Sequence, residues 1–98
     1  MSTRVAITGT GAISPVGIDS FESWDSIKNG KLGISKITSF DSSNLNVHIA
    51  AEVKNFNPEE KLGKKDSRRL DRFSQFACVA ATEALDMSGL DMESIDAT

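Results

Sequence analysis

The chain has 98 residues, enough for one small domain or part of a larger one, with 11 basic and 14 acidic residues and a net charge of −3. No apolar run approaches the roughly 18 residues that suggest a membrane span, and we expect no secretory signal in the start MSTRVAITG. The single cysteine, Cys78, excludes an intrachain disulfide and fits a reducing cytosol, and with His48 as the only histidine no Cys/His cluster has metal-ligand spacing.

The first predicted element is a buried strand at residues 4–8, a run rich in β-branched residues that Gly9 ends. The segment GTGAISPVG follows, and its glycines and proline predict an irregular turn. We expect Gly9, Gly11 and Gly17 either to adopt positive φ or to allow a close approach of backbone.

A glycine-rich turn after a strand can also begin a dinucleotide-binding motif. Here Ser14 replaces the third glycine and Pro15 follows directly. No acidic residue ends a second strand about 20 residues further on, as that motif requires. The pattern therefore favours a structural turn, and we expect no nucleotide or other cofactor.

The next predicted element is a helix that begins at Asp19 and ends at Gly30. Asp19 and Glu22 have the spacing of a capping box, and a glycine is a common helix stop. One face of this helix is apolar, with Phe21, Trp24 and Ile27.

The middle of the chain predicts little regular structure. Residues 34–46 read as a loop, and residues 47–53 as a strand with poor alternation, which makes a structural or surface role the default for His48. Asn57 can cap a short helical turn with Pro58 at its first position, and Gly63 should end that turn.

The longest predicted helix lies within residues 61–90, starts at Asp66 or Ser67 and ends at Gly89. Apolar residues recur along it at spacings of three and four, namely Leu70, Phe73, Ala77, Ala80 or Ala81, and Ala84. The apolar face is wide, so we expect most of this helix to be buried. Cys78 lies on that side, which predicts a structural thiol and not a nucleophile.

The start of the same helix carries a cluster of positive charge. Six basic residues, Lys61, Lys64, Lys65, Arg68, Arg69 and Arg72, stand against Asp66 and Asp71, a local net charge of about +4. We expect Lys65, Arg68, Arg69 and Arg72 to share one exposed face. Such a patch on an acidic protein is a candidate docking site for an anionic partner, although ordinary solvated surface is the alternative.

The order of strand, helix, strand and long helix predicts an α/β protein. A long helix with a wide apolar face needs a sheet to cover, and two short strands make a poor one. We therefore interpret residues 1–98 as the N-terminal part of a larger α/β fold, with no complete domain boundary inside them.

Several segments together resemble a known family. They are RVAITGTGAISPVG, a helix carrying Trp24, GKLGISKITSFD, KNFNP and SRRLDRFSQFACVAATEAL, in that order. The chain resembles the N-terminus of β-ketoacyl-acyl-carrier-protein synthases over nearly its whole length, most closely the chain-elongating type II. The opening motif and the RRLDRF helix are specific in combination.

The resemblance implies the N-terminal part of a thiolase-like fold of two similar halves, and a cytoplasmic homodimer. It also implies acyl transfer to a cysteine and decarboxylative condensation with malonyl-carrier protein, helped by two histidines. Those residues lie beyond residue 98 in the family, and neither Cys78 nor His48 matches them, so no catalytic residue is expected here. No metal, nucleic acid or membrane partner is implied.

The family's contact with acyl carrier protein, an acidic helical bundle, does match residues of this chain. The matching positions are Lys64, Lys65, Arg68 and Arg69. The alternative hypothesis is a free-standing small α/β binding module whose basic helix holds an acidic protein or nucleic acid. A chain with an isoelectric point near 5.0 argues against nucleic acid.

Overall fold

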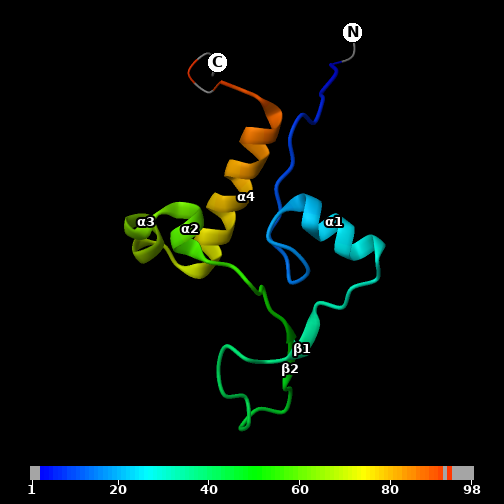
Figure 1. The fold of residues 1–98 in the computed structure, drawn as a ribbon, viewed down its shortest axis with the longest axis vertical. Helices are drawn as coiled ribbons and strands as arrows, with labels where there is room; N and C mark the ends of the chain where they lie inside the picture. The colour runs from blue at the N-terminus through cyan, green and yellow to red at the C-terminus, as the bar shows by residue number, and fades with distance from the viewer. Residues whose placement is uncertain (1–2, 92, 94–98) are drawn as a thin grey trace.

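The computed structural model describes residues 3–91 and 93. Its elements in order are α1 (Ser20–Lys28), β1 (Ile34–Lys36), β2 (Ile49–Ala51), α2 (Pro58–Leu62), α3 (Lys64–Arg69) and α4 (Arg72–Ser88). Figure 1 shows the glycine-rich segment beside α4, the β1–β2 hairpin at the lower end, and α2 and α3 together at one side. The radius of gyration is 17.1 Å, against about 13 Å for a compact domain of this size. The structure is therefore open. Residues 1–2, 92 and 94–98 of the predicted N-terminal part lie outside the described residues.

Residues 4–8 run as a drawn-out segment (Figure 1) and pair with no strand in the described ranges. Val5 and Ile7 are 89% and 86% exposed. The prediction of a buried strand is wrong for this structure. β-branched residues favour extended backbone, but a strand also needs a hydrogen-bonded neighbour, and residues 3–91 and 93 supply none.

The glycine-rich segment packs its backbone directly against α4. A Cβ atom on Gly9 would collide with the carbonyl oxygen of Ala84, and one on Gly11 with that of Ala80. Neither glycine has positive φ. Of the two predicted roles, close approach is thus the correct one for Gly9 and Gly11.

Helix α1 is anchored by serines and not by its apolar face. Ser23 and Ser26 are each 7% exposed, and their hydroxyls donate to Gly17 O and Val16 O at 3.3 and 2.7 Å. The predicted cap is confirmed, since Asp19 Oδ1 accepts from the amide of Glu22 at 2.6 Å. The apolar face points outward, with exposed fractions of 80%, 60% and 61% for Phe21, Trp24 and Ile27.

The two strands form an antiparallel hairpin in which Ser35 pairs with Ala50. The strand predicted within residues 47–53 is confirmed in shortened form, but β1 occupies the start of the segment that was predicted as loop. Glu52 closes the connecting loop, because its carboxylate accepts from the amides and hydroxyls of Thr38 and Ser39. These hydrogen bonds, chiefly the one from the Ser39 hydroxyl, lower the pKa of Glu52 to about 2.

The predicted single long helix is two helices. Asn57 caps α2 as expected, and Gly63, with φ of 85°, separates α2 from α3. The chain then turns extended at Leu70 and Asp71 before α4 begins. The predicted caps at Asp66 and Ser67 are therefore wrong for α4, whose first turn has no side-chain cap. Gly89 ends α4 in the left-handed conformation, as predicted.

The core is small and centres on one aromatic pair. Phe56, 9% exposed, is the one buried hydrophobic residue in the described part of the chain. Its ring meets that of Phe76 edge-on at 5.1 Å, and the guanidinium of Arg72 lies 5.4 and 5.1 Å from the two ring centroids. The prediction of a mostly buried long helix is wrong here, since Phe73 is 73% exposed. An apolar face predicts only that a helix can be covered, not that the cover lies within these residues.

Candidate functional site

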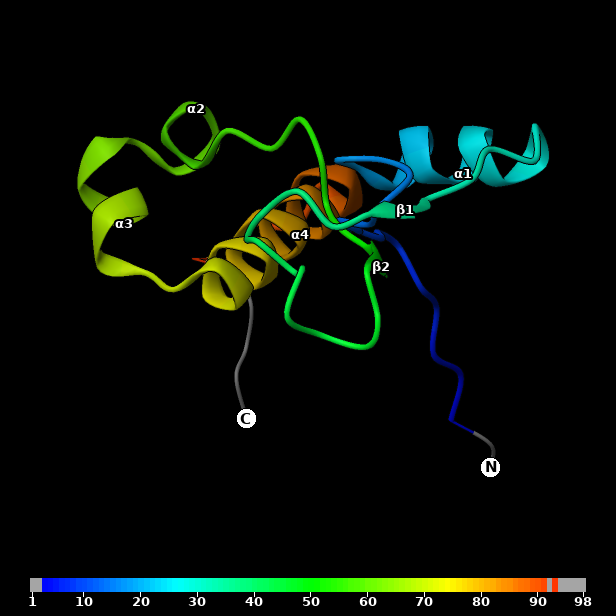
Figure 2. The same ribbon diagram turned by 90° about the horizontal axis from the view of Figure 1, so that it is seen from below.

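The candidate site is the short helix α3, which carries the four basic residues singled out by the sequence. Lys64, Lys65, Arg68 and Arg69 together line one shallow hollow of about 470 Å³. An α-helix turns about 100° per residue, so their side chains spread over an arc of about 140°. Figures 1 and 2 both show α3 at the outer edge of the molecule, away from α1 and the hairpin. The four cations therefore form a single exposed basic surface.

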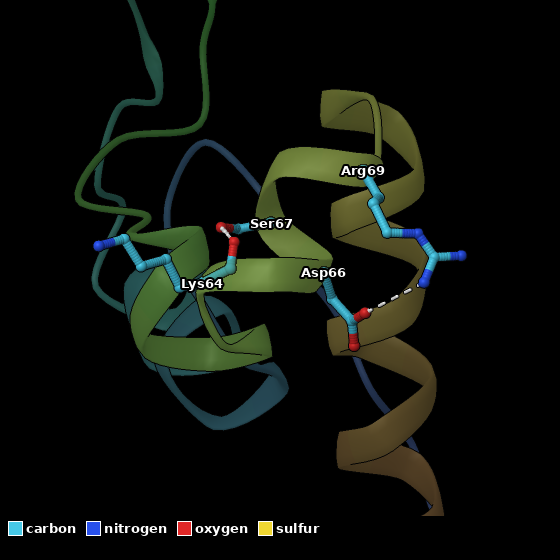
Figure 3. A network of polar contacts seen from close by, with 4 residues as sticks. All are labelled: Lys64, Asp66, Ser67 and Arg69. Atoms are coloured by element: carbon cyan, nitrogen blue, oxygen red, sulfur yellow. Dashed lines mark hydrogen bonds and ion pairs between the residues drawn. The ribbon is translucent and has the colours of Figure 1, made fainter.

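The polar contacts within α3 leave most of this charge free. Figure 3 shows Lys64 and Arg69 extending away from each other, with Asp66 turned toward Arg69. Arg69 Nη1 lies 3.9 Å from Asp66 Oδ1, a long and solvent-exposed ion pair. The Ser67 hydroxyl donates a hydrogen bond to Lys64 O at 2.9 Å. Lys64, Lys65 and Arg68 make no ion pair within the described residues, so they are available to an anion.

Two other basic residues of the sequence cluster lie elsewhere. Arg72 was expected on the same face, but its guanidinium stacks on Phe56 and Phe76 and donates to Val53 O at 3.4 Å. The break at Leu70–Asp71 changes the helix direction, which is why the predicted face ends at Arg69. Lys61 belongs to α2 and faces a different hollow, which Glu83 also lines.

Sequence reasoning missed Gln75, which ties α3 to α4. Its side chain is 7% exposed, and its Nε2 donates to Ser67 O at 2.8 Å and to Leu70 O at 3.3 Å. The available signal was an uncharged amide between Phe73 and Phe76 in an otherwise apolar stretch. The apolar spacing predicted one continuous helix, in which Gln75 was only a polar position.

The remaining candidates form no catalytic centre. Cys78 is exposed on α4, so the prediction of a buried thiol is wrong, because the side of α4 that carries it is uncovered. His48 Nδ1 lies 3.3 Å from Ser42 Oγ, a contact that helps to close the hairpin loop and fits the structural role expected for His48. Residues 3–91 and 93 contain no group of three or more potential metal ligands. Within the same residues no helix is long and apolar enough to cross a membrane.

The family is shown by a match of residues 2–98 to the model described as "Beta-ketoacyl synthase, N-terminal domain". The chain therefore belongs to the β-ketoacyl synthase family. This confirms the resemblance drawn from the segments around the glycine-rich turn and the RRLDRF helix.

Individual relatives agree with this assignment. The chain is 49% identical over 89 residues to 3-oxoacyl-[acyl-carrier-protein] synthase 2 of Staphylococcus aureus (strain COL), covering 91% of this chain and 22% of the relative. It is 42% identical over 89 residues to the protein of the same name from Vibrio harveyi, covering 91% and 21%. The chain thus spans about a fifth of the length of these curated relatives.

A solved structure supports the fold. The structure described as "The ishigamide ketosynthase/chain length factor" is similar with a TM-score of 0.78 and 30% sequence identity, over 91% of this chain and 22% of that one. The predicted fold class, the N-terminal portion of a thiolase-like α/β fold, is confirmed. The family match also favours the condensing enzyme over the free-standing binding module.

Proposed function

We propose that this chain is the N-terminal part of a fatty-acid condensing enzyme and that helix α3 docks the acyl carrier protein. The proposed reaction is acyl transfer to a cysteine followed by decarboxylative condensation with malonyl-carrier protein. Family membership and the names of the two relatives support this activity. The cysteine and histidines that the family implies lie beyond residue 98. We therefore expect the 98 residues alone to be inactive, because covalent catalysis needs nucleophile and base in contact.

The observation that carries the docking proposal is the basic surface of α3 on a chain whose net charge is −3. Lys64, Lys65 and Arg68 are free of ion pairs among the described residues, so a partner's carboxylates meet cations that are not already compensated. The partner that the family supplies is an acidic carrier protein. Charge of opposite sign steers such a partner toward the surface and fixes its orientation.

The expected contribution of this surface is moderate. Exposed ion pairs are worth about 0.2–1 kcal/mol each. Four together would contribute about 1–3 kcal/mol, a factor of roughly five to a hundred in affinity. Salt should weaken the effect, because exposed charges are screened. The surface is therefore expected to set KM for carrier-linked substrates and not the rate of the chemical step.

The same family relationship supports further parts of the proposal. We expect the complete enzyme to be a cytoplasmic homodimer that needs no cofactor, and to have neither nucleic acid nor membrane as a partner. Sedimentation of the complete enzyme would test the dimer directly.

The docking test is charge reversal of Lys65→Glu with Arg68→Glu in the complete enzyme. These two residues are chosen because reversing the charge of Arg69 would also leave Asp66 without its ion-pair partner. The matched control is Lys28→Glu with Lys31→Glu, which changes net charge equally at exposed positions on and just after α1. Each enzyme is assayed with malonyl-carrier protein and with a truncated malonyl thioester that lacks the carrier.

The α3 variant removes two of the four ion pairs, so it should raise KM for malonyl-carrier protein by about two- to thirtyfold and leave the truncated thioester unaffected. The control variant should change neither. Equal loss with both substrates would show that α3 stabilises the fold and does not dock the carrier. No loss with either substrate would mark the patch as ordinary solvated surface.

A further inference from the structure

Gln75 is the one buried residue in helix α4. It is 7% exposed, whereas the apolar Phe73 two residues earlier is 73% exposed. Burying an amide costs free energy unless its hydrogen bonds are made, so its position calls for specific partners. No buried side-chain polar atom in the described part of the chain lacks a hydrogen-bond partner.

The partners of Gln75 are the carbonyls at the end of α3. Its Nε2 donates to Ser67 O at 2.8 Å and to Leu70 O at 3.3 Å. A side-chain amide has two N–H donors, which suits two acceptors. The last carbonyls of a helix have no partner inside that helix, so Gln75 acts as a cap supplied by the following helix. Both bonds cross the break at Leu70–Asp71.

Helix α3 lies against α2, but apart from Gln75 little holds it to α4. The helix has six residues, none of them buried, and Gly63 at its start gives no side-chain cap. The guanidinium of Arg72, near the same break, donates to Val53 O and stacks on the rings of Phe56 and Phe76, none of which belongs to α3. The amide of Gln75 is therefore the side-chain tie between α3 and α4 that the described residues show.

We propose that Gln75 is a positioning residue that fixes the orientation of α3, and hence of Lys64, Lys65, Arg68 and Arg69, for docking an acidic partner. This inference rests on the docking function proposed above. Without the tie, α3 keeps its charges but presents them over a range of orientations. A partner that contacts several of these charges at once then binds less tightly, because part of the binding free energy is used to order the helix.

The test uses Gln75→Glu and Gln75→Met in the complete enzyme. Gln75→Glu keeps the size but removes both donors and places a carboxylate against two carbonyl oxygens. Gln75→Met removes the donors without adding charge. It replaces the glutamate variant in the assay if that variant fails to fold. The control is Thr82→Val, which removes the Thr82 Oγ1 to Cys78 O bond further along the same helix. Thermal unfolding of each variant reports on stability.

Gln75→Met should raise KM for malonyl-carrier protein about three- to tenfold, while kcat and the KM for the truncated thioester stay unchanged. Thr82→Val should leave both KM values unchanged. An unchanged KM for the carrier-linked substrate, or an equal rise in KM with both substrates, would overturn the inference.

A double-mutant cycle of Gln75→Met with Arg68→Glu separates positioning from a general loss of stability. If Gln75 acts through the charges of α3, the second change should cost less once the first is present. Fully additive effects on KM would contradict positioning. If Arg68→Glu with Lys65→Glu has no effect, the docking function itself fails. If that pair has its effect but Gln75→Met has none, only the positioning inference fails.

Discussion

The carboxylate of Glu83 in α4 accepts hydrogen bonds from both the amide and the hydroxyl of Ser20, the first residue of α1. The hydroxyl donates to Oε2 at 2.8 Å, and the amide donates to the same carboxylate at 2.9 and 3.1 Å. Ala12 of the glycine-rich segment adds a third donor group at 2.9 Å. Burial alone would raise the pKa of Glu83, but these hydrogen bonds and the charge of Lys61 outweigh it and lower the pKa. One carboxylate thus joins the glycine-rich segment and the start of α1 to α4, which lies more than 60 residues further along the sequence.

Glu83→Gln should destabilise the protein by about 1–3 kcal/mol in urea unfolding, because an amide cannot accept from all three donor groups. The NH₂ group of the new glutamine side chain would face an N–H donor of either Ser20 or Ala12, and two donors cannot form a hydrogen bond with each other. The control is Glu60→Gln, an exposed position in α2. A Glu83→Gln variant as stable as the control would show that Glu83 contributes no net stability.

Glu52 predicts a pH dependence in the hairpin. Its pKa in the folded protein is about 2, against an ordinary value of 4.5. A lowered folded pKa means that its contribution to stability is complete above 4.5 and is lost as the pH falls toward about 2. NMR titration of the Ser39 amide should therefore show no midpoint near 4.5. Ser39→Ala removes the largest cause of the shift and should move the midpoint upward, and an unmoved midpoint would refute this assignment.

Gly11→Ala should be far more damaging than an ordinary glycine replacement. The added methyl would meet the carbonyl oxygen of Ala80, and overpacking of this kind typically costs about 1–3 kcal/mol and sometimes more. Gly30→Ala is the comparison, because nothing lies within 4 Å there and only its φ of 69° opposes the change. Unfolding midpoints should rank Gly11→Ala below Gly30→Ala. The reverse order would mean that the N-terminal segment does not pack on α4.

Cys78 in the 98-residue chain should react quickly with an iodoacetamide probe. Its side chain is exposed on α4, so the thiol meets solvent without local unfolding. The labelling rate in buffer should be close to the rate in denaturant. A native rate far below the denatured one would restore the buried thiol that the sequence predicted.

Local signals in the sequence predicted local structure well. Asp19, Asn57, Gly63 and Gly89 each stand at the helix end that the sequence assigned to them, because capping depends on side chains within a few residues. The predicted docking residues Lys64 to Arg69 also share one surface, since neighbours on a single helix stay together. The α/β class was predicted from the order of the elements, whereas its thiolase-like identity came from the resemblance.

Features that depend on distant partners were not predicted. Residues 4–8 have the composition of a buried strand, but pairing depends on a neighbour that composition does not reveal. The apolar spacing from Leu70 onward runs through the break at Asp71, because periodicity does not register an extended backbone of two residues. Gln75 escaped notice for the same reason, since its acceptors exist only after the chain has turned.

The contact between the glycine-rich segment and α4 limits which second mutations can compensate for a glycine-to-alanine substitution. The atom that Gly11 faces is the backbone oxygen of Ala80, which every amino acid shares, so no replacement at position 80 relieves Gly11→Ala. Gly33 differs, because an added Cβ there would lie 2.9 Å from Val16 Cγ1 and 3.0 Å from Pro15 Cβ. Trimming Val16 to alanine removes one of those atoms. Revertants of Gly33→Ala can therefore arise at position 16, whereas Gly11→Ala has no such route through a smaller side chain at position 80.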